Sequence, residues 1–250
     1  MKESRPTAVV RPRPLLRSLK LGERVARILV KRLTSEGDRA EAVPTEQEIC
    51  EEFGVSKTVA REVFSQLVSM RLVAVRHGRR TRRRPSSQWD YLNPVLIDVL
   101  SESDLILELL RELHQVRLLL EPEVAALAAE RVDEARIARM RQLIESMQTA
   151  MDDPDVFLDL DVAFHGELVA AVDNRILSQL VDSIGELLRA SRRVTQLLPH
   201  ALVIGTEGHA AVLEAVIARD PDGARAAMIR HIEFAAAAWT DKRTRVREAV

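Results

Sequence analysis

Two polar residues one helical turn apart, Asp161 and His165, stand in an apolar stripe that is typical of a core-facing helix. The apolar positions recur every three or four residues and are Leu158, Val162, Leu168, Val169 and Val172. A buried carboxylate costs on the order of several kcal/mol unless it gains hydrogen bonds, a counter-charge or a metal ion. We therefore expect Asp161 to have a partner that compensates its charge.

Two further histidines, His209 and His231, stand on the inward faces of two later helical runs. Between them, Asp220 is suited to cap a helix and Pro221 to begin it, so the chain should form a helical hairpin here. His209 lies 11 residues before Asp220, and His231 lies 11 residues after it. Because both helices rise by about 1.5 Å per residue, the two imidazoles should reach the same height and could share a ligand.

One carboxylate and three imidazoles that converge from three helices form a reasonable ligand set for a divalent ion of Zn, Ni, Mn or Fe. Such a set leaves coordination positions for water or for an oxygen of a bound molecule. The alternative is that each histidine is an ordinary hydrogen-bonded core residue, and for one histidine alone that is the commoner case. Three of the six histidines of the chain at inward positions favour the metal site.

The helices that must position these residues fit a mainly α-helical protein. Ala, Leu, Glu and Arg are abundant in the 250 residues, whereas only 3% of the residues are aromatic. The chain is long enough for two domains. It shows no secretory signal and no apolar run of about 18 or more residues, so we expect a cytoplasmic protein. The single cysteine, Cys50, excludes an intrachain disulfide and suits core packing.

The two halves of the chain carry opposite charge. Residues 1–88 hold 20 Lys and Arg against 10 Asp and Glu, a net charge of +10, and the remaining residues hold 17 against 28, or −11. A basic module joined to an acidic one indicates an anionic partner for the first and a different task for the second.

The basic half begins with residues 1–17, which hold three Pro and four Arg without periodicity and are expected to be a disordered basic arm. A first helix is expected from about Leu19 to Leu33, marked by Val25, Ile28, Leu29 and Leu33 and ended by Gly37-Asp38.

Two short helices joined by a tight turn are expected next. Thr45 and Glu48 form a capping box that opens the first of them, and Gly54 ends it. Ser56 can cap the second, whose buried stripe is Val59, Val63, Leu67 and Met70. This helix presents cationic and hydroxylic residues outward at its start, the pattern of a helix-turn-helix; they are Lys57, Thr58 and Arg61.

A β-hairpin is expected after this helix, with strands over residues 72–75 and 81–84 and a turn over 76–79. The turn and the return strand hold many cations, which suit DNA phosphates: Arg76, Arg79, Arg80, Arg82, Arg83 and Arg84. A solvated charge run is the alternative, but the place of the run after a helix-turn-helix favours a wing. Residues 18–84 are therefore predicted to be a winged helix-turn-helix DNA-binding domain.

The motifs of this half resemble the winged helix-turn-helix of GntR-type bacterial transcription regulators. They are Val43-Pro44-Thr45-Glu46-Gln47-Glu48-Ile49, Phe53-Gly54-Val55-Ser56, Val59-Ala60-Arg61-Glu62-Val63 and Leu67. The resemblance implies that Lys57, Thr58 and Arg61 contact operator DNA and that His77-Gly78 enters the minor groove. Arg79, beside this pair, is included in the predicted DNA contact. Gln47 departs from the pattern, since several members have an arginine there.

The acidic half is predicted to be all helical. Residues 85–95 are expected to be an interdomain linker, and residues 96–247 an effector-binding and dimerisation domain. Its helices are expected over 95–101, 104–130, 134–151, 155–172, 175–198, 206–218 and 221–247. The predicted fold class is thus mainly α, with an N-terminal winged helix-turn-helix and a C-terminal helical bundle.

Most of residues 96–240 resemble the FCD domain, the helical effector domain of the fatty-acid-regulator branch of the same family. The motif Glu112-Leu-His-Gln-Val-Arg117-Leu-Leu-Leu-Glu121-Pro122 is similar to the first long helix of that domain. The resemblance implies that Arg117 grips an effector carboxylate; an intrahelical pair with Glu121 is the alternative. It also implies metal ligation by the same four residues as the burial argument, namely Asp161, His165, His209 and His231.

Three other polar residues of this half, Asn174, His114 and His200, differ in their relation to this site. Asn174 either caps the helix that follows or lines the effector pocket. His114 and His200 match no ligand position and are expected to be ordinary. The segment Gln88-Trp89-Asp90-Tyr91-Leu92 is similar to that of galactonate-type members, which respond to sugar acids.

These observations favour a dimeric, ligand-controlled repressor that binds pseudo-palindromic operator DNA through its basic half. Its acidic half would bind a small carboxylate through a divalent metal ion and Arg117. A metal-dependent hydrolase is the competing function, but the sequence shows no general base beside the site and no nucleophile motif, so we expect no enzyme activity. An architectural nucleic-acid binder with a structural metal is the third possibility.

Overall fold

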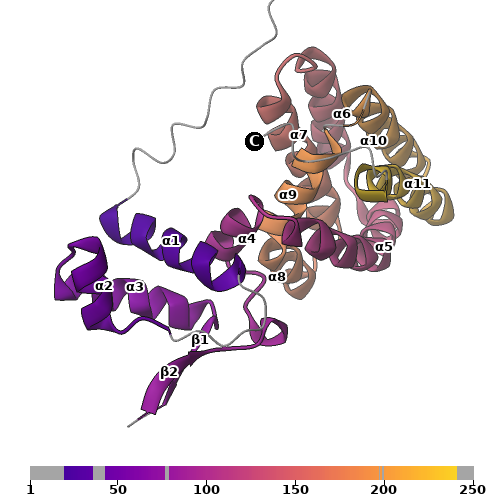
Figure 1. The fold of residues 1–250 in the computed structure, drawn as a ribbon. Helices are drawn as coiled ribbons and strands as arrows, with labels where there is room; N and C mark the ends of the chain where they lie inside the picture. Colours follow the sequence, from indigo (N-terminus) through magenta and orange to yellow (C-terminus); the bar gives the residue numbers. More distant parts are fainter. Residues whose placement is uncertain (1–19, 36–42, 77–78, 197, 199, 241–250) are drawn as a thin grey trace, which may run out of the picture. The chain divides into compact units, whose positions relative to one another are not determined.

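The computed structural model of the chain describes residues 20–35, 43–76, 79–196, 198 and 200–240 (Figure 1). These residues form eleven α-helices and one two-stranded sheet, which confirms the predicted mainly α class. The chain divides into two compact units, of which the first ends at Ser103 and the second begins at Asp104. The predicted arm over residues 1–17 and the predicted helix end at Gly37-Asp38 lie outside the described residues.

The first unit contains the expected helix-turn-helix. Its helices are α1 (Leu21–Ser35), α2 (Glu46–Phe53) and α3 (Lys57–Ser69). The capping box of α2 is confirmed, because Thr45 Oγ1 accepts the Glu48 N–H at 3.2 Å and Glu48 Oε2 accepts the Thr45 N–H at 2.7 Å. Gly54 follows in the left-handed conformation, with a φ of 62° that costs glycine little.

The core of this unit lies between α1 and α3. Leu29, Val63 and Leu67 are fully buried, as the periodicity predicts. Ile28, which also marked α1 in the sequence, is 49% exposed. The face of α1 that packs inward instead includes Ala26 and Val30, small and β-branched residues on either side of Leu29.

The wing is an antiparallel hairpin of β1 (Val73–Arg76) and β2 (Arg79–Arg83), with Val73 opposite Arg83. Strand β1 begins one residue later than expected and β2 begins two residues earlier, because Arg76 and Arg79, which were expected in the turn, pair with each other. The backbone N–H of Arg84 donates to the carbonyl of Leu72 at 2.8 Å and extends the pairing.

The segment after the wing is folded onto the first unit. Trp89 is buried and donates its Nε1–H to the carbonyl of Arg84 at 3.0 Å, and the Asp90 N–H donates to Met70 at 2.9 Å. Helix α4 (Pro94–Leu100) follows, capped by Asn93, and packs against α1. The residues expected to form a linker and the first helix of the acidic half thus pack in the unit that holds the helix-turn-helix.

The second unit is a bundle of seven helices within the described residues (Figure 1). They are α5 (Leu105–Arg131), α6 (Glu134–Thr149), α7 (Pro154–Ala171), α8 (Arg175–Ser183), α9 (Gly185–Thr195), α10 (Ala201–Ile217) and α11 (Pro221–Thr240). Helix α11 packs along α5 and α10, and α7 contacts α5, α6 and α9. No helix in the described part of the chain is both long and apolar enough to cross a bilayer.

Two helices of this unit differ clearly from the prediction. The helix expected over 175–198 is two helices, because Ile184 leaves the helical conformation with φ −96° and ψ 4°. The helix expected from Thr206 begins at Ala201, directly after His200 in the left-handed conformation with φ 59°. The last helix is described to Thr240, and the residues after it lie outside the described part.

Candidate metal centre

The four predicted metal ligands converge inside the second unit. Asp161 and His165 come from α7, His209 from α10 and His231 from α11, and one ligand atom of each lies within 4.8 Å of all the others. Asp161, His165 and His209 are buried, and His231 is half-buried. The stripe on α7 includes two large residues that the prediction left out, Phe157 and Phe164. Phe164 is fully buried, and its ring centroid lies 4.6 Å from that of His209.

The hairpin of α10 and α11 brings His209 and His231 to the same level, with ring centroids 4.4 Å apart. Asp220 caps α11 by accepting the Gly223 N–H at 2.9 Å, so the turn begins as the sequence indicates. The close approach also needs Gly208, because a Cβ at this position would lie 2.5 Å from His231 Nδ1. A residue without a side chain therefore makes room for the third imidazole.

The hydrogen bonds of His165 set which of its nitrogens can bind a cation. Its Nδ1 lies 2.9 Å from Glu121 Oε2, and its Nε2 faces His209 Nε2 at 3.3 Å. Because a carboxylate only accepts, the proton is on Nδ1, and the lone pair of Nε2 points into the cluster. Histidine ligands are typically oriented in this way by a carboxylate behind the ring, so the donor set fits a divalent cation.

Burial and neighbouring charges give these groups the protonation states that metal ligation requires. Burial and the nearby Arg192 guanidinium lower the pKa of His165 from 6.5 to about 4, although Glu121 opposes the shift. Burial also lowers the pKa of His231 well below its ordinary value. Burial raises the pKa of Asp161, but Arg192 and His209 outweigh it and hold this pKa below its usual value. At pH 7 His165 and His231 are neutral and Asp161 is ionised.

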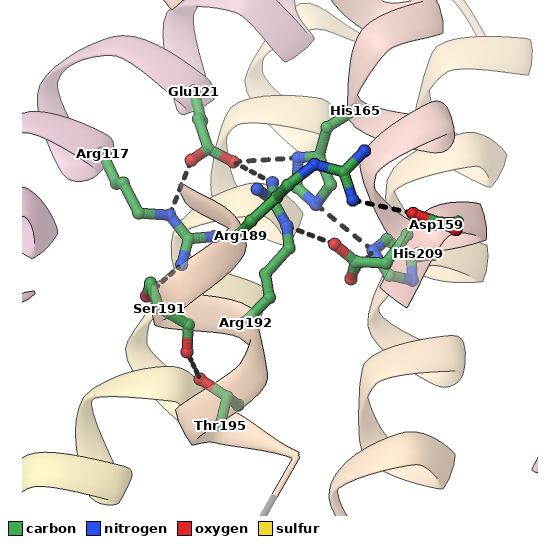
Figure 2. Close-up of polar contacts among 10 residues, drawn as sticks. Arg117, Glu121, Asp159, His165, Arg189, Ser191, Arg192, Thr195 and His209 are labelled. Atoms are coloured by element: carbon green, nitrogen blue, oxygen red, sulfur yellow. Dashed lines mark hydrogen bonds and ion pairs between the residues drawn. The ribbon is translucent and has the colours of Figure 1, made fainter. Parts of the chain in front are cut away.

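Two charged residues beside the cluster were not predicted as part of the site (Figure 2). Arg192 of α9 contacts Asp161 through Nε and lies 4.0 Å from Glu121 Oε2 through Nη2. Arg192 follows the buried Leu188 by four residues, so helical periodicity indicated an inward position. Its basic neighbours Arg189 and Arg193 obscured this signal in the sequence.

Glu121 lies at the centre of this charged group. It accepts from Arg117 Nε at 2.6 Å, so the intrahelical pair that is the alternative role of Arg117 is present. Arg117 also donates to Ser191 Oγ at 3.4 Å. Burial raises the pKa of Glu121, but Arg117 and His165 together hold it well below the usual range.

A partly open pocket lies beside the cluster, and the space within it, counted together with the adjoining solvent, is about 420 Å³. Its charged and polar lining comes from α5, α7, α9 and α11 and consists of Arg117, Asp161, Arg192, Thr195, Gln196 and His231. A second pocket lies against His165 and Glu121 and has mainly apolar walls. The first cavity combines two proposed ligands with two guanidinium groups, which suits a small anionic molecule.

Asn174 and His200 are placed away from these features. Asn174 is exposed and accepts the N–H groups of Ile176 and Leu177 at 3.0 and 3.1 Å, so it caps α8, the first of its two expected roles. Its role in effector binding stays a prediction. His200 is exposed just before α10.

The predicted DNA-contacting residues of the first unit lie on one exposed face of α3. Lys57, Thr58 and Arg61 are all exposed, and Arg61 Nε is 3.6 Å from Glu46 Oε2. His77-Gly78 lies outside the described residues, as does the side chain of Arg79, whose backbone belongs to β2. Contact of these residues with DNA therefore stays a prediction.

Comparison with known proteins gives two matches that together span most of the chain. Residues 21–82 match the bacterial regulatory proteins of the gntR family, and residues 112–234 match the FCD domain. The galactonate operon transcriptional repressor of Escherichia coli strain K12 is 31% identical over 76% of this chain and 83% of its own length. The HTH-type transcriptional repressor NanR of Citrobacter rodentium strain ICC168 is 30% identical over 92% of this chain and 89% of its own length.

A solved structure shows the same fold. It is titled "Lar controls the expression of the Listeria monocytogenes agr system and mediates virulence" and has a TM-score of 0.58 at 14% identity. The match covers 90% of this chain and 99% of that chain.

Proposed function

The chain belongs to the GntR family of bacterial regulatory proteins and carries an FCD domain, and from this we propose that it is a ligand-responsive repressor. In this proposal a small carboxylate, held at a divalent metal ion in the second unit, releases the first unit from operator DNA. The chain is a transcription regulator like its relatives and not an enzyme, which sets the hydrolase alternative aside.

The observation that carries the proposal is the convergence of four ligand atoms within 4.8 Å beside a cavity that two guanidinium groups line. A divalent cation bound there would supply a positive centre for carboxylate or hydroxyl oxygens of the effector. Arg117 and Arg192 reach the same cavity and would orient the other end of the molecule. These groups favour an anion with several oxygen atoms.

We propose a hydroxycarboxylic acid of the sugar-acid type as the effector. The most direct support is the relative at 31% identity, which is a galactonate operon transcriptional repressor. A sugar acid combines one carboxylate with several hydroxyl groups, and the cavity offers polar partners for both in Thr195 and Gln196.

For the first unit we propose that α3 enters the major groove and the wing follows the phosphate backbone. One such helix reads only a few base pairs, so we propose a homodimer on a pseudo-palindromic operator. The protein would act in the cytoplasm, where that DNA lies. An architectural DNA binder with a structural metal would keep its DNA when a small molecule is added, whereas a ligand-responsive repressor would release it.

The proposal can be tested with duplex DNA that the full-length protein selects from a random pool. Fluorescence anisotropy would follow release of this DNA by aldonic, uronic and other hydroxy acids, each with Zn²⁺ and with a chelator. We expect at least one acid to release DNA with the metal and to lose this effect with the chelator. If no acid of the panel changes either DNA affinity or thermal stability, the proposed effector class is wrong.

The matched variants are His209→Ala, inside the cluster, and His200→Ala, at an exposed position before the same helix. His209→Ala should bind DNA without effector but lose metal content and effector response together. His200→Ala should behave as the wild type. A stoichiometric metal in the His209 variant, with release by the acid intact, would contradict the shared site.

A further inference from the structure

The guanidinium group of Arg192 already pairs with Asp161, one of the four proposed metal ligands. Arg192 Nε contacts Asp161 Oδ2, while the other oxygen, Oδ1, lies 3.3 Å from His209 Nε2. Arg192 is 6% exposed and Asp161 is 7% exposed, so water screens this pair only slightly. A divalent cation in the cluster would have to share one carboxylate with a guanidinium group.

The charges of the buried group balance without a metal. Arg117 and Arg192 supply two positive charges, and Glu121 and Asp161 supply two negative ones. A divalent cation with neutral imidazoles adds two positive charges to a group that is almost closed to water. Excess buried charge is costly unless an anion enters or an existing cation moves.

The two arginines differ in what holds them. Arg117 pairs with Glu121 Oε1 at 2.6 Å and donates to Ser191, and neither partner belongs to the four proposed metal ligands. Arg192 makes its close contact with a proposed metal ligand, Asp161. A cation in the cluster therefore competes with Arg192 and leaves the partners of Arg117 in place.

We propose that Arg192 is the internal counter-ion of Asp161 in the metal-free protein and that metal loading releases its guanidinium group to hold the anionic effector. This inference rests on the proposed function, since it concerns the regulation of the same site. Arg192 and Arg117 both line the pocket beside the cluster, so the released group has the effector within reach. A carboxylate remains near the released guanidinium group, because Glu121 Oε2 lies 4.0 Å from Arg192 Nη2.

This arrangement couples the two ligands. Without metal, Arg192 is paired with Asp161. Of the two guanidinium groups in the pocket, only that of Arg117 is then available to bind the effector. Without effector, the metal must displace a buried guanidinium group that gains no new partner. By linkage, each ligand then raises the affinity of the protein for the other by the same factor.

The test compares Arg192→Gln with Arg189→Gln in the full-length, chelator-treated protein. Arg189 lies one turn earlier on α9, pairs with Asp159 at 2.7 Å and has a side chain 39% exposed, so it is the matched control (Figure 2). Titration calorimetry with Zn²⁺ alone, without effector, measures the competition directly. We expect Arg192→Gln to bind Zn²⁺ about tenfold more tightly or better, because a buried positive charge next to the ligands is gone. Arg189→Gln should match the wild type.

The Arg192→Gln variant should also lose its response to the effector. Its affinity for Zn²⁺ therefore rises while its affinity for the effector falls. Zn²⁺ affinity that is unchanged or weaker in a folded Arg192→Gln protein would overturn the inference. If Arg192 had a purely structural role, its replacement would lower the affinity for Zn²⁺ and for the effector together. Failure of the wild type to release DNA with any acid would instead count against the proposed function and leave the Zn²⁺ comparison valid.

A second measurement uses the wild type and does not depend on the fold of a variant. With ¹⁵N-labelled arginine, the Nε–H resonance of Arg192, assigned with Arg192→Lys, should shift on addition of one equivalent of Zn²⁺. The resonance of Arg189 should stay in place. An Arg192 resonance that is unchanged in the Zn²⁺-loaded protein would show that the guanidinium group keeps its contact with Asp161, and the inference would be wrong.

Discussion

The Nδ1 atom of His165 lies 2.9 Å from Glu121 Oε2, and its Nε2 faces the interior of the four-ligand cluster. One carboxylate on α5 thereby fixes the tautomer of a ligand on α7. Glu121 also accepts from Arg117, so the position of the imidazole depends on a pair of charged residues that lines the second, mainly apolar pocket.

We expect Glu121→Gln to lower Zn²⁺ affinity by about tenfold to a hundredfold, the usual effect of losing the partner that orients a histidine ligand. The control is Glu123→Gln on the same helix, because Glu123 is exposed and pairs with Arg225 at 2.6 Å. Calorimetric titration of both proteins measures the difference. Equal Zn²⁺ affinities in the two variants would show that Glu121 does not orient His165.

Gly208→Ala should displace the ring of His231, since the added Cβ would lie 2.5 Å from Nδ1. We expect lower Zn²⁺ affinity with DNA binding retained in the absence of effector. The control is Gly205→Ala on the same helix, where the nearest atom, Phe157 Cζ, is 3.9 Å from the new Cβ. That change should stabilise the helix by about 0.5–1 kcal/mol and leave the metal affinity unchanged. Wild-type Zn²⁺ affinity in the Gly208 variant would contradict the packing argument.

The metal-free protein should lose stability as the pH is lowered from about 6.5 to about 4. The pKa of His165 is lowered to about 4 in the folded protein, from its ordinary value of 6.5, so the unfolded chain binds more protons in this window. Stability is therefore fully present above pH 6.5 and falls by up to about 3 kcal/mol for this group by pH 4. Urea denaturation between pH 4 and 8, with His165→Gln as the control, would measure it. A free energy of unfolding that is flat across this window in the wild type would refute the prediction.

Arg61→Ala should weaken binding to the selected DNA while the fold stays intact, because the side chain is exposed at the start of α3. Loss of a bidentate contact to a base typically costs about 1–3 kcal/mol of discrimination. Arg82→Ala, in the wing, should weaken binding to all sequences alike and reduce the salt dependence. Anisotropy with selected and scrambled DNA at several salt concentrations separates the two effects. If Arg61→Ala leaves the preference for the selected DNA unchanged, α3 does not read the sequence through this residue.

The four proposed ligands could be found from the sequence because helical periodicity and a symmetric hairpin are local properties. The spacing of Asp161 and His165 and the turn at Asp220-Pro221 fix their relative heights without knowledge of the other helices. Helical periodicity places Arg192 on the inward face of α9, but the contacts of Arg192 and Glu121 within the site depend on how α5, α7 and α9 pack, which no local pattern specifies. The sequence resemblance pointed to Arg117 but gave no indication that a second guanidinium group contacts Asp161.

Helix ends that are set by neighbouring residues could be predicted from the sequence, whereas features set by tertiary contacts could not. The capping box at Thr45 and the cap at Asp220 are formed by neighbouring residues and were predicted correctly. The break at Ile184 has neither a proline nor a polar cap at that residue, and the sequence therefore predicted one continuous helix. The packing of α4 on α1 also depends on residues far apart in the chain, including the ion pair of Arg27 with Asp98.

The buried indole of Trp89 makes the base of the wing an optical reporter. Its Nε1–H is bound to the carbonyl of Arg84, and the Arg83 guanidinium lies 4.9 Å from the ring centroid, so its emission depends on the order of β2. The chain has two tryptophans, and Trp239→Phe would leave Trp89 as the single emitter. The emission maximum should then move to longer wavelength as the first unit unfolds, and fluorescence would follow that unit while the metal centre is followed by calorimetry. An emission maximum already at the wavelength of free tryptophan in the folded variant would show that the indole is open to water.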